Sequence, residues 1–266
     1  MKTVLITGAT RGIGKYLAKE FASNGYSVHI IGRNEECGNE VIKELESINN
    51  KCQHRFFSVD LSLVSENKKF LEFYKNKYKS LDILILNANI RPKKRIDITR
   101  EGYNNVLITG VISKYLFSVG LKNLLENAEA SKVIHIGDAR LLQKISYNKF
   151  IDGDISGMKS LLGAYTGSAY ISNFFAKKSI MDVHTEFINP GMVNTDGESA
   201  SFWIKMISKK TDYIAKRIAT HIINNDSIKK YVGFFNIDKE NSLAKKLDKK
   251  ESEFNKLMSI IGKITK

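Results

Sequence analysis

Proline and cysteine are scarce in this 266-residue chain, which contains two of each. Cys37 and Cys52 provide neither a disulfide framework nor the spacing of metal ligands, so we interpret both as reduced thiols and expect no metal site. No run of 18 apolar residues is present, which excludes a conventional membrane-spanning helix. The first apolar run, Val4 to Ile6, leaves no room for a signal peptide before it. We therefore expect a cytoplasmic protein.

Acidic residues are outnumbered by basic ones, 28 against 42, which gives a formal net charge of +14. The lysines are spread along the whole chain and form no single basic run. This distribution favours solvated lysine faces over a surface for nucleic acid or anionic lipid, which stays open as the alternative. Hydrophobic residues make up 42% of the chain and charged residues 26%, as in a folded globular protein.

Short apolar segments alternate along the chain with longer stretches of helical periodicity. The apolar segments lack the polar alternation of half-exposed strands, which is typical of parallel strands covered on both faces. The expected strands cover residues 4–6, 26–31, 56–59, 81–86, 133–136, 183–188 and 231–235, and the expected helices cover 13–24, 36–48, 62–79 and 101–127, with a further helix around Tyr165.

Alternating strands and helices of this kind predict βαβ units. Because crossover connections are right-handed, the expected fold is an α/β structure: a single Rossmann-type, doubly wound parallel sheet with helices on both faces. No internal repeat or linker interrupts it, so we expect one domain over residues 1–238. A lysine-rich C-terminal helix is expected over 239–266.

A glycine-rich turn joins the first expected strand to the first expected helix. Its glycines follow the spacing Gly-x-x-x-Gly-x-Gly, in the strand–turn–helix context that distinguishes a dinucleotide site from an ordinary turn. Glycine lets the backbone approach a pyrophosphate, which the N-terminus of a helix attracts. The residues expected to bind a cofactor here are Gly8, Thr10, Arg11, Gly12, Ile13 and Gly14.

Charge at the end of the second expected strand indicates which cofactor binds. A carboxylate there would hydrogen-bond a ribose 2′-hydroxyl and repel a 2′-phosphate. This chain has Arg33 instead, and Arg11 lies within the glycine turn. Two guanidinium groups suit a phosphate dianion, so the sequence predicts NADP(H) rather than NAD(H). The alternative is that both arginines are ordinary surface charges.

The spacing of the glycine turn, together with motifs farther along the chain, resembles the short-chain dehydrogenase/reductase superfamily over roughly residues 1 to 235. Within it, the long segment before Tyr165 resembles the retinol-dehydrogenase and WW-domain-oxidoreductase branch. The resemblance implies further contacts with the adenine, the nicotinamide or the ribose. It assigns these to Asp60 and Leu61, to Asn87 and Ala88, to Tyr165, and to Pro190, Gly191, Val193 and Thr195.

The catalytic positions implied by the resemblance are largely replaced. The family pairs a tyrosine with a lysine four residues later, which lowers the phenol pKa; here Tyr165 is followed by Ala169. The position of the family's serine holds Asp138, and that of its asparagine falls at Gly110. An ionised Asp138 near Tyr165 would raise the phenol pKa, the wrong direction for a base.

Three interpretations of this catalytic region stay open. Asp138 acts as the acid or base itself, another lysine such as Lys144 reaches the site, or Tyr165 only packs against the cofactor. We therefore consider two functions. The favoured one is a non-catalytic or weakly active NADP(H)-binding protein, a pseudoenzyme that works with a protein partner. The alternative is an active NADP-dependent oxidoreductase that uses Tyr165 and Asp138 on a small or lipophilic carbonyl or alcohol.

Two further segments have open roles. The apolar residues of 202–207 either cover a hydrophobic substrate or pack on the core. The C-terminal helix either docks on its own domain or binds a partner or membrane surface. A small-molecule substrate or protein partner and a homodimer stay open, and nucleic acid is not expected. The helix carries an apolar stripe made of Leu243, Leu247, Phe254, Leu257 and Ile261.

Overall fold

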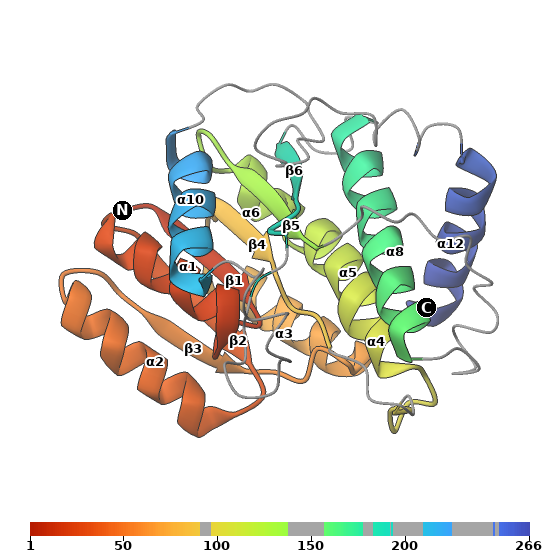
Figure 1. Ribbon diagram of the computed structural model, residues 1–266, viewed down its shortest axis with the longest axis horizontal. Coiled ribbons are helices and arrows are strands. Elements are labelled where there is room, and N and C mark those ends of the chain that lie inside the picture. The colour runs from red at the N-terminus through yellow and green to blue at the C-terminus, as the bar shows by residue number, and fades with distance from the viewer. Residues whose placement is uncertain are drawn as a thin grey trace.

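Six parallel strands form the centre of the molecule (Figure 1). The computed structural model describes residues 1–90, 97–137, 157–177, 183–191, 193, 210–224, 247 and 250–266. The strand order is β3-β2-β1-β4-β5-β6. Successive strands are added toward one edge from β1 to β3 and toward the other edge from β4 to β6, so the topological switch point lies between β1 and β4. The predicted doubly wound α/β fold is confirmed. The strands are β1 (Thr3–Thr7), β2 (Ser27–Gly32), β3 (Arg55–Ser58), β4 (Ile83–Leu86), β5 (Lys132–Ile136) and β6 (His184–Ile188).

Helices cover both faces of this sheet (Figure 1). One layer contains α1 (Gly12–Ser23), α2 (Glu35–Ile48) and α10 (Thr211–Asn224). The other contains α3 (Val64–Lys77), α4 (Asn105–Leu107), the π-helix η1 (Ile108–Ile112), α5 (Ser113–Gly120), α6 (Lys122–Glu126) and α8 (Gly157–Lys177). Outside α8 lies α12 (Glu251–Ile264).

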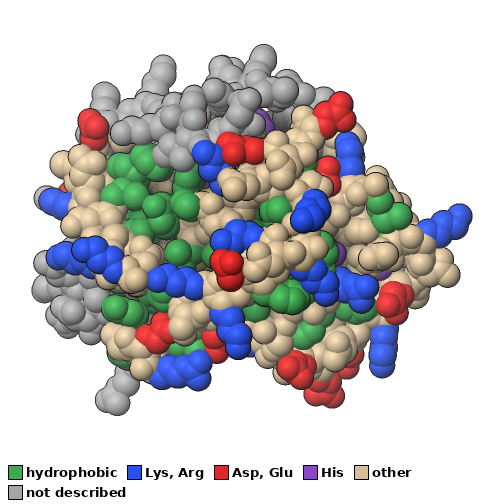
Figure 2. Space-filling view, turned by 180° about the vertical axis from the view of Figure 1, so that it is seen from behind, with side chains coloured by type: hydrophobic (Ala, Val, Ile, Leu, Met, Phe, Trp, Pro, Cys, Tyr) green, Lys and Arg blue, Asp and Glu red, His purple; other side chains and the backbone are tan. Residues whose placement is uncertain are grey.

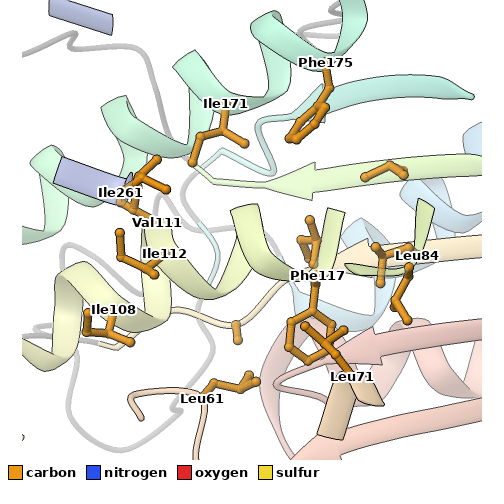
Figure 3. Close-up of a cluster of buried hydrophobic side chains, with 14 of the residues drawn as sticks. Leu61, Leu71, Leu84, Ile108, Val111, Ile112, Phe117, Ile171, Phe175 and Ile261 are labelled. Carbon is orange, nitrogen blue, oxygen red and sulfur yellow. The ribbon is translucent and has the colours of Figure 1, made fainter. Parts of the chain in front are cut away.

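The alternation of side chains along the strands divides the core into two clusters. In β1, Val4 and Ile6 face the helices α1, α2 and α10, whereas Leu5 faces α3, η1, α5 and α8. Both faces are apolar because both are covered, which explains the continuous hydrophobic runs in the sequence. Figure 3 shows the second cluster, where Phe117 of α5 and Phe175 of α8 extend into the same layer.

The C-terminal helix α12 packs against its own chain. Leu257 and Ile261, two members of the apolar stripe, are buried in the cluster around α8. A Cβ atom at Gly167 of α8 would lie 2.9 Å from Val111 and 3.7 Å from Leu257, so this glycine lets η1 and α12 approach α8 closely. Leu243 lies outside the described residues.

The helix expected over 101–127 is broken into several pieces. The Asn104 side chain accepts hydrogen bonds from the backbone N–H groups of Val106 and Leu107, which starts a new helix at residue 105. The π-helical stretch η1 follows, and the chain turns again at Leu121. Periodicity did not reveal these breaks, because every piece keeps an apolar face. The strand expected at 231–235 and the apolar segment 202–207 lie outside the described residues.

Basic side chains on the face seen in Figure 2 are interspersed with acidic and neutral ones and do not merge into one patch. Across the described part of the chain, no helix is both long enough and apolar enough to cross a membrane.

Candidate cofactor and catalytic site

The glycine turn lies at the carboxyl edge of the sheet, between β1 and α1. The backbone N–H groups of Gly8 and Ala9 donate to the carbonyl oxygen of Ile31, at 2.8 and 3.3 Å, which ties the turn to the end of β2. Gly8 and Gly12 have φ angles of 67° and 57°, a region that disfavours other residues. These two glycines are therefore required by the path of the backbone.

The same turn is packed closely against the loop that follows β4. A Cβ atom at Gly8 would lie 2.9 Å from the Cα of Ala88, and one at Gly14 would lie 2.5 Å from the carbonyl oxygen of Gly8. The Asn87 side chain donates to the carbonyl oxygens of Thr7 and Gly8, at 3.1 and 3.0 Å. Asn87 and Ala88 thus lie beside the glycine turn, and Asn87 has a structural role in holding it.

The N-terminus of α1 points out of this turn without a side-chain cap. Arg11 is the capping residue, its side chain makes no capping hydrogen bond, and the first turn contains no acidic residue. The N–H groups at the start of a helix carry a partial positive charge and need an acceptor. The backbone around Gly12 to Gly14 is therefore suited to an anion.

Two arginines flank the turn. The Thr10 methyl would lie 2.5 Å from a Cβ atom at Gly32, so the glycine turn touches the last residue of β2. Arg11 follows Thr10 and Arg33 follows Gly32, so the structure brings these two basic positions together. The Nη1 of Arg33 is 3.9 Å from Oδ2 of Asp60, longer than a hydrogen bond, and its side chain is 62% exposed.

The predicted contacts after β3 and β6 lie at this same edge of the sheet. Asp60 accepts hydrogen bonds from the backbone N–H and the hydroxyl of Ser62, and Leu61 is buried. Pro190 is half-buried, Gly191 is exposed with a φ angle of 76°, and Val193 packs against the core. Thr195 lies outside the described residues.

Tyr165 lies on α8, opposite the end of β5. Its ring carbon Cδ1 would be 3.0 Å from a Cβ atom at Gly137, so the half-buried phenol ring rests on the residue that follows β5. Ala169, four residues later, is fully buried in the core. A Cβ atom at Gly110 would lie 2.7 Å from Ala164 and 3.3 Å from Asn89 Oδ1. Gly110 is therefore packed closely against α8 and against Asn89, with little room for a larger side chain. Asp138 and Lys144 lie outside the described residues.

A lysine that the sequence analysis missed contacts the helix that carries Tyr165. Lys114 of α5 is buried, and its Nζ donates to the carbonyl oxygen of Ile136 at 2.9 Å and to Ser168 Oγ at 3.3 Å. Burial away from water lowers the pKa of Lys114 from 10.5 to about 7. The sequence contains a signal for it, because Lys114 is the one charged residue between Glu101 and Lys122.

A parallel sheet with this strand order and a glycine turn at its topological switch point defines a dinucleotide-binding α/β fold. The family model for short chain dehydrogenases matches residues 2–141, more than half of the chain. The chain therefore belongs to the short-chain dehydrogenase family.

Individual relatives are distant. The chain is 27% identical over 224 residues to an uncharacterized oxidoreductase of Schizosaccharomyces pombe, a match covering 78% of this chain and 66% of that protein. It is also 27% identical over 214 residues to a 3-oxoacyl-[acyl-carrier-protein] reductase of Chlamydia pneumoniae, covering 77% and 82%. A Burkholderia cenocepacia short chain dehydrogenase in complex with NADP has a similar fold, with a TM-score of 0.69 and 19% identity, covering 88% of this chain and 94% of that one.

Proposed function

We propose that this chain binds NADP(H) and that its ordinary hydride transfer is weak or absent. The contact between Thr10 and Gly32 carries the first half of this proposal, because it brings Arg11 and Arg33 together beside the uncapped N-terminus of α1. The proposed contacts are the sixteen residues assigned above from the glycine turn to Thr195, and the domain is proposed to span residues 1–238, with a separate helix over 239–266.

The phosphate end of the crevice fits this cofactor. The uncapped N–H groups at Gly12 to Gly14 suit the pyrophosphate, since they require an acceptor. Arg33 stands where a carboxylate would favour NAD(H), and its long, exposed pairing with Asp60 leaves the guanidinium able to bind a 2′-phosphate. When bound, NADP(H) supplies or accepts a hydride at its nicotinamide ring.

The opposite end of the crevice supports weak or absent chemistry. Tyr165 is in place against Gly137, but the helical position four residues later is the fully buried Ala169. An alanine has no charge to lower the phenol pKa, whereas the family places a lysine at this position for that purpose. The proposed role of such a protein is to bind NADP(H) as a subunit or regulator in the cytoplasm, with a protein partner or a second copy.

A second candidate is an active oxidoreductase with altered acid and base groups, acting on a small or lipophilic carbonyl or alcohol. The observation that favours it is Lys114, a buried amine that donates to Ser168, three residues after Tyr165 on α8. Tyr165 and Asp138 are the proposed acid and base, and Lys144 is a further source of positive charge. The lipophilic substrate follows from the resemblance to the retinol-dehydrogenase branch.

The test is a pair of measurements on the purified protein. We expect NADPH fluorescence to titrate to saturation, and single-turnover mixing with aldehydes, ketones and quinones to oxidise little or no NADPH. Turnover that is lost in both Asp138→Asn and Tyr165→Phe would instead support the second candidate, and turnover that is lost in Asp138→Asn but kept in Tyr165→Phe would support Asp138 as the acid or base itself. Arg55 is an exposed arginine at the amino end of β3. Arg55→Ala is therefore the matched control for removal of a positive charge, and it should bind NADPH normally.

A further inference from the structure

The buried amine of Lys114 is the feature that the family resemblance does not explain. Lys114 is fully enclosed between α5, β5 and α8, and its two hydrogen-bond acceptors, the carbonyl oxygen of Ile136 and Ser168 Oγ, are both uncharged. No carboxylate lies within 4.0 Å of its Nζ among the described residues. An unpaired buried ammonium is costly, so its placement calls for a functional explanation.

Lys114 contacts the end of β5 and the helix that carries Tyr165. Ile136, whose carbonyl accepts from Lys114, is the last residue of β5 and also accepts from Asn89 Nδ2 at 3.4 Å. The next residue, Gly137, supports the ring of Tyr165. Ser168, the second acceptor, is one helical turn after Tyr165. The amine is therefore held between the carboxyl end of β5 and the turn of α8 that follows Tyr165.

The surroundings allow this amine to change charge near neutral pH. Burial holds the pKa of Lys114 at about 7, and on β5 burial and the positive charge of Lys114 hold the pKa of His135 well below 6.5. From α3, the apolar Phe70 and Leu71 pack toward α5. Tyr165 is the titratable residue of the adjacent turn of α8, and Asp138 follows β5 outside the described residues.

We propose that the charge of Lys114 sets the preference of this site for reduced over oxidised cofactor. The inference rests on the proposed binding of NADP(H), with the nicotinamide ring above Gly137 and Tyr165. That ring is cationic in NADP⁺ and neutral in NADPH. A protonated Lys114 repels the cationic ring through a poorly screened interior and leaves the neutral ring unaffected.

The expected size of this preference follows from Coulomb's law. Two unit charges about 10 Å apart in a partly buried environment change an equilibrium by roughly three- to tenfold. Below about pH 7 the amine is charged and NADP⁺ binds more weakly than NADPH by this additional factor. As pH rises through the pKa of Lys114, the repulsion disappears and NADP⁺ affinity increases relative to NADPH. The 2′-phosphate titrates in both forms, so it cancels from the ratio.

The experiment measures Kd for NADP⁺ and for NADPH at a series of values from about pH 6 to about pH 8.5. In the unmodified protein we expect the ratio Kd(NADP⁺)/Kd(NADPH) to fall by roughly three- to tenfold across this range. Lys114→Met should give a ratio that is independent of pH and equal to the high-pH value. Lys132→Met is the matched control, because Lys132 is also buried and donates to a carbonyl, that of Ile222, at the other end of β5.

Three results would count against the role of Lys114 or against the proposed function. A ratio that is flat with pH in the unmodified protein overturns the inference even if Lys114→Met fails to fold. A pH dependence that survives in Lys114→Met, or that disappears in Tyr165→Phe instead, assigns the effect to another group and also overturns it. Failure of NADPH to bind at every pH refutes the proposed function itself, a result distinct from the two before it.

Discussion

The glycine turn and the region around Tyr165 differ in how their residues are held. At the phosphate end, the glycine turn, Asn87 and the uncapped start of α1 form an arrangement held by backbone contacts that leave almost no room for change. At the catalytic end, Ala169 and Gly110 are small residues in closely packed positions, and a buried Lys114 approaches from a different helix. Under the proposed function, cofactor binding and hydride chemistry are separable requirements of one fold.

The largest expected effect comes from breaking the phosphate end. Gly14→Ala places a Cβ atom 2.5 Å from the carbonyl oxygen of Gly8 and 2.7 Å from Asn87 Nδ2, so the turn must shift. We expect NADPH affinity to fall by about 100-fold or more, because the first N–H groups of α1 lose their alignment. Gly262→Ala, where a Cβ atom meets nothing within 4 Å, is the control and should bind normally in the same fluorescence titration.

The next effect concerns Lys114, where we expect a substitution to stabilise the protein. Burial lowers the pKa of Lys114 from 10.5 to about 7. When Lys114 is protonated in the folded protein, this shift lowers the free energy of unfolding by on the order of 5 kcal/mol. Lys114→Met removes this cost, and we expect the free energy of unfolding to rise by about 1–4 kcal/mol, since an apolar replacement of a buried charge is often stabilising. Urea unfolding measures it.

The pH dependence of this gain follows from the direction of the shift. Because the folded-state pKa is depressed, the cost of Lys114 is fully present below about pH 7 and disappears as pH approaches 10.5. The stabilisation by Lys114→Met should therefore shrink between these values. A destabilised Lys114→Met at pH 6 would show that the amine supports the fold through its hydrogen bonds, contrary to this account.

A smaller effect sharpens the assignment of the cofactor. Arg33→Ala should weaken NADPH binding by roughly tenfold, as expected for loss of a charge-assisted contact with the 2′-phosphate, while leaving NADH binding within about twofold. Equal losses for both cofactors would mean that Arg33 supports the loop and does not select the phosphate. The comparison requires low ionic strength, because the guanidinium is exposed.

The smallest expected effect is that of Tyr165→Phe. Removing one hydroxyl from the half-buried ring should change NADPH affinity by less than about threefold, since the ring still packs on Gly137. We also expect no measurable loss of single-turnover oxidation, because Ala169 replaces the lysine that the family pairs with this tyrosine. A large fall in turnover would show that the catalytic end works after all.

Much of the fold and the path of the glycine turn was predictable because short-range patterns determine them. Buried parallel strands require continuous apolar runs, and a positive φ angle at Gly8 requires glycine, so both features appear in the sequence. The breaks between α4 and α6 were not predicted, because the Asn104 cap and the π-helical stretch preserve the apolar periodicity. The helix α10 was also missed.

Lys114 was missed for a different physical reason. Whether a lysine in an apolar helix is buried or extends its amine to water depends on neighbours that are distant in sequence, here Ile136 and Ser168. The same holds for Glu186 of β6, which accepts from His221 at 2.8 Å in the opposite layer. Burial opposes its ionisation, but hydrogen bonds from His184 and His221 outweigh this and lower the pKa of Glu186. Tertiary packing decides such groups.

The most direct test of the account is a crystal structure determined with excess NADPH. We expect the pyrophosphate at the N–H groups of Gly12 to Gly14, the 2′-phosphate between Arg11 and Arg33, and the nicotinamide ring beside Tyr165. A crevice filled by protein side chains, with no cofactor at this saturating concentration, would contradict it.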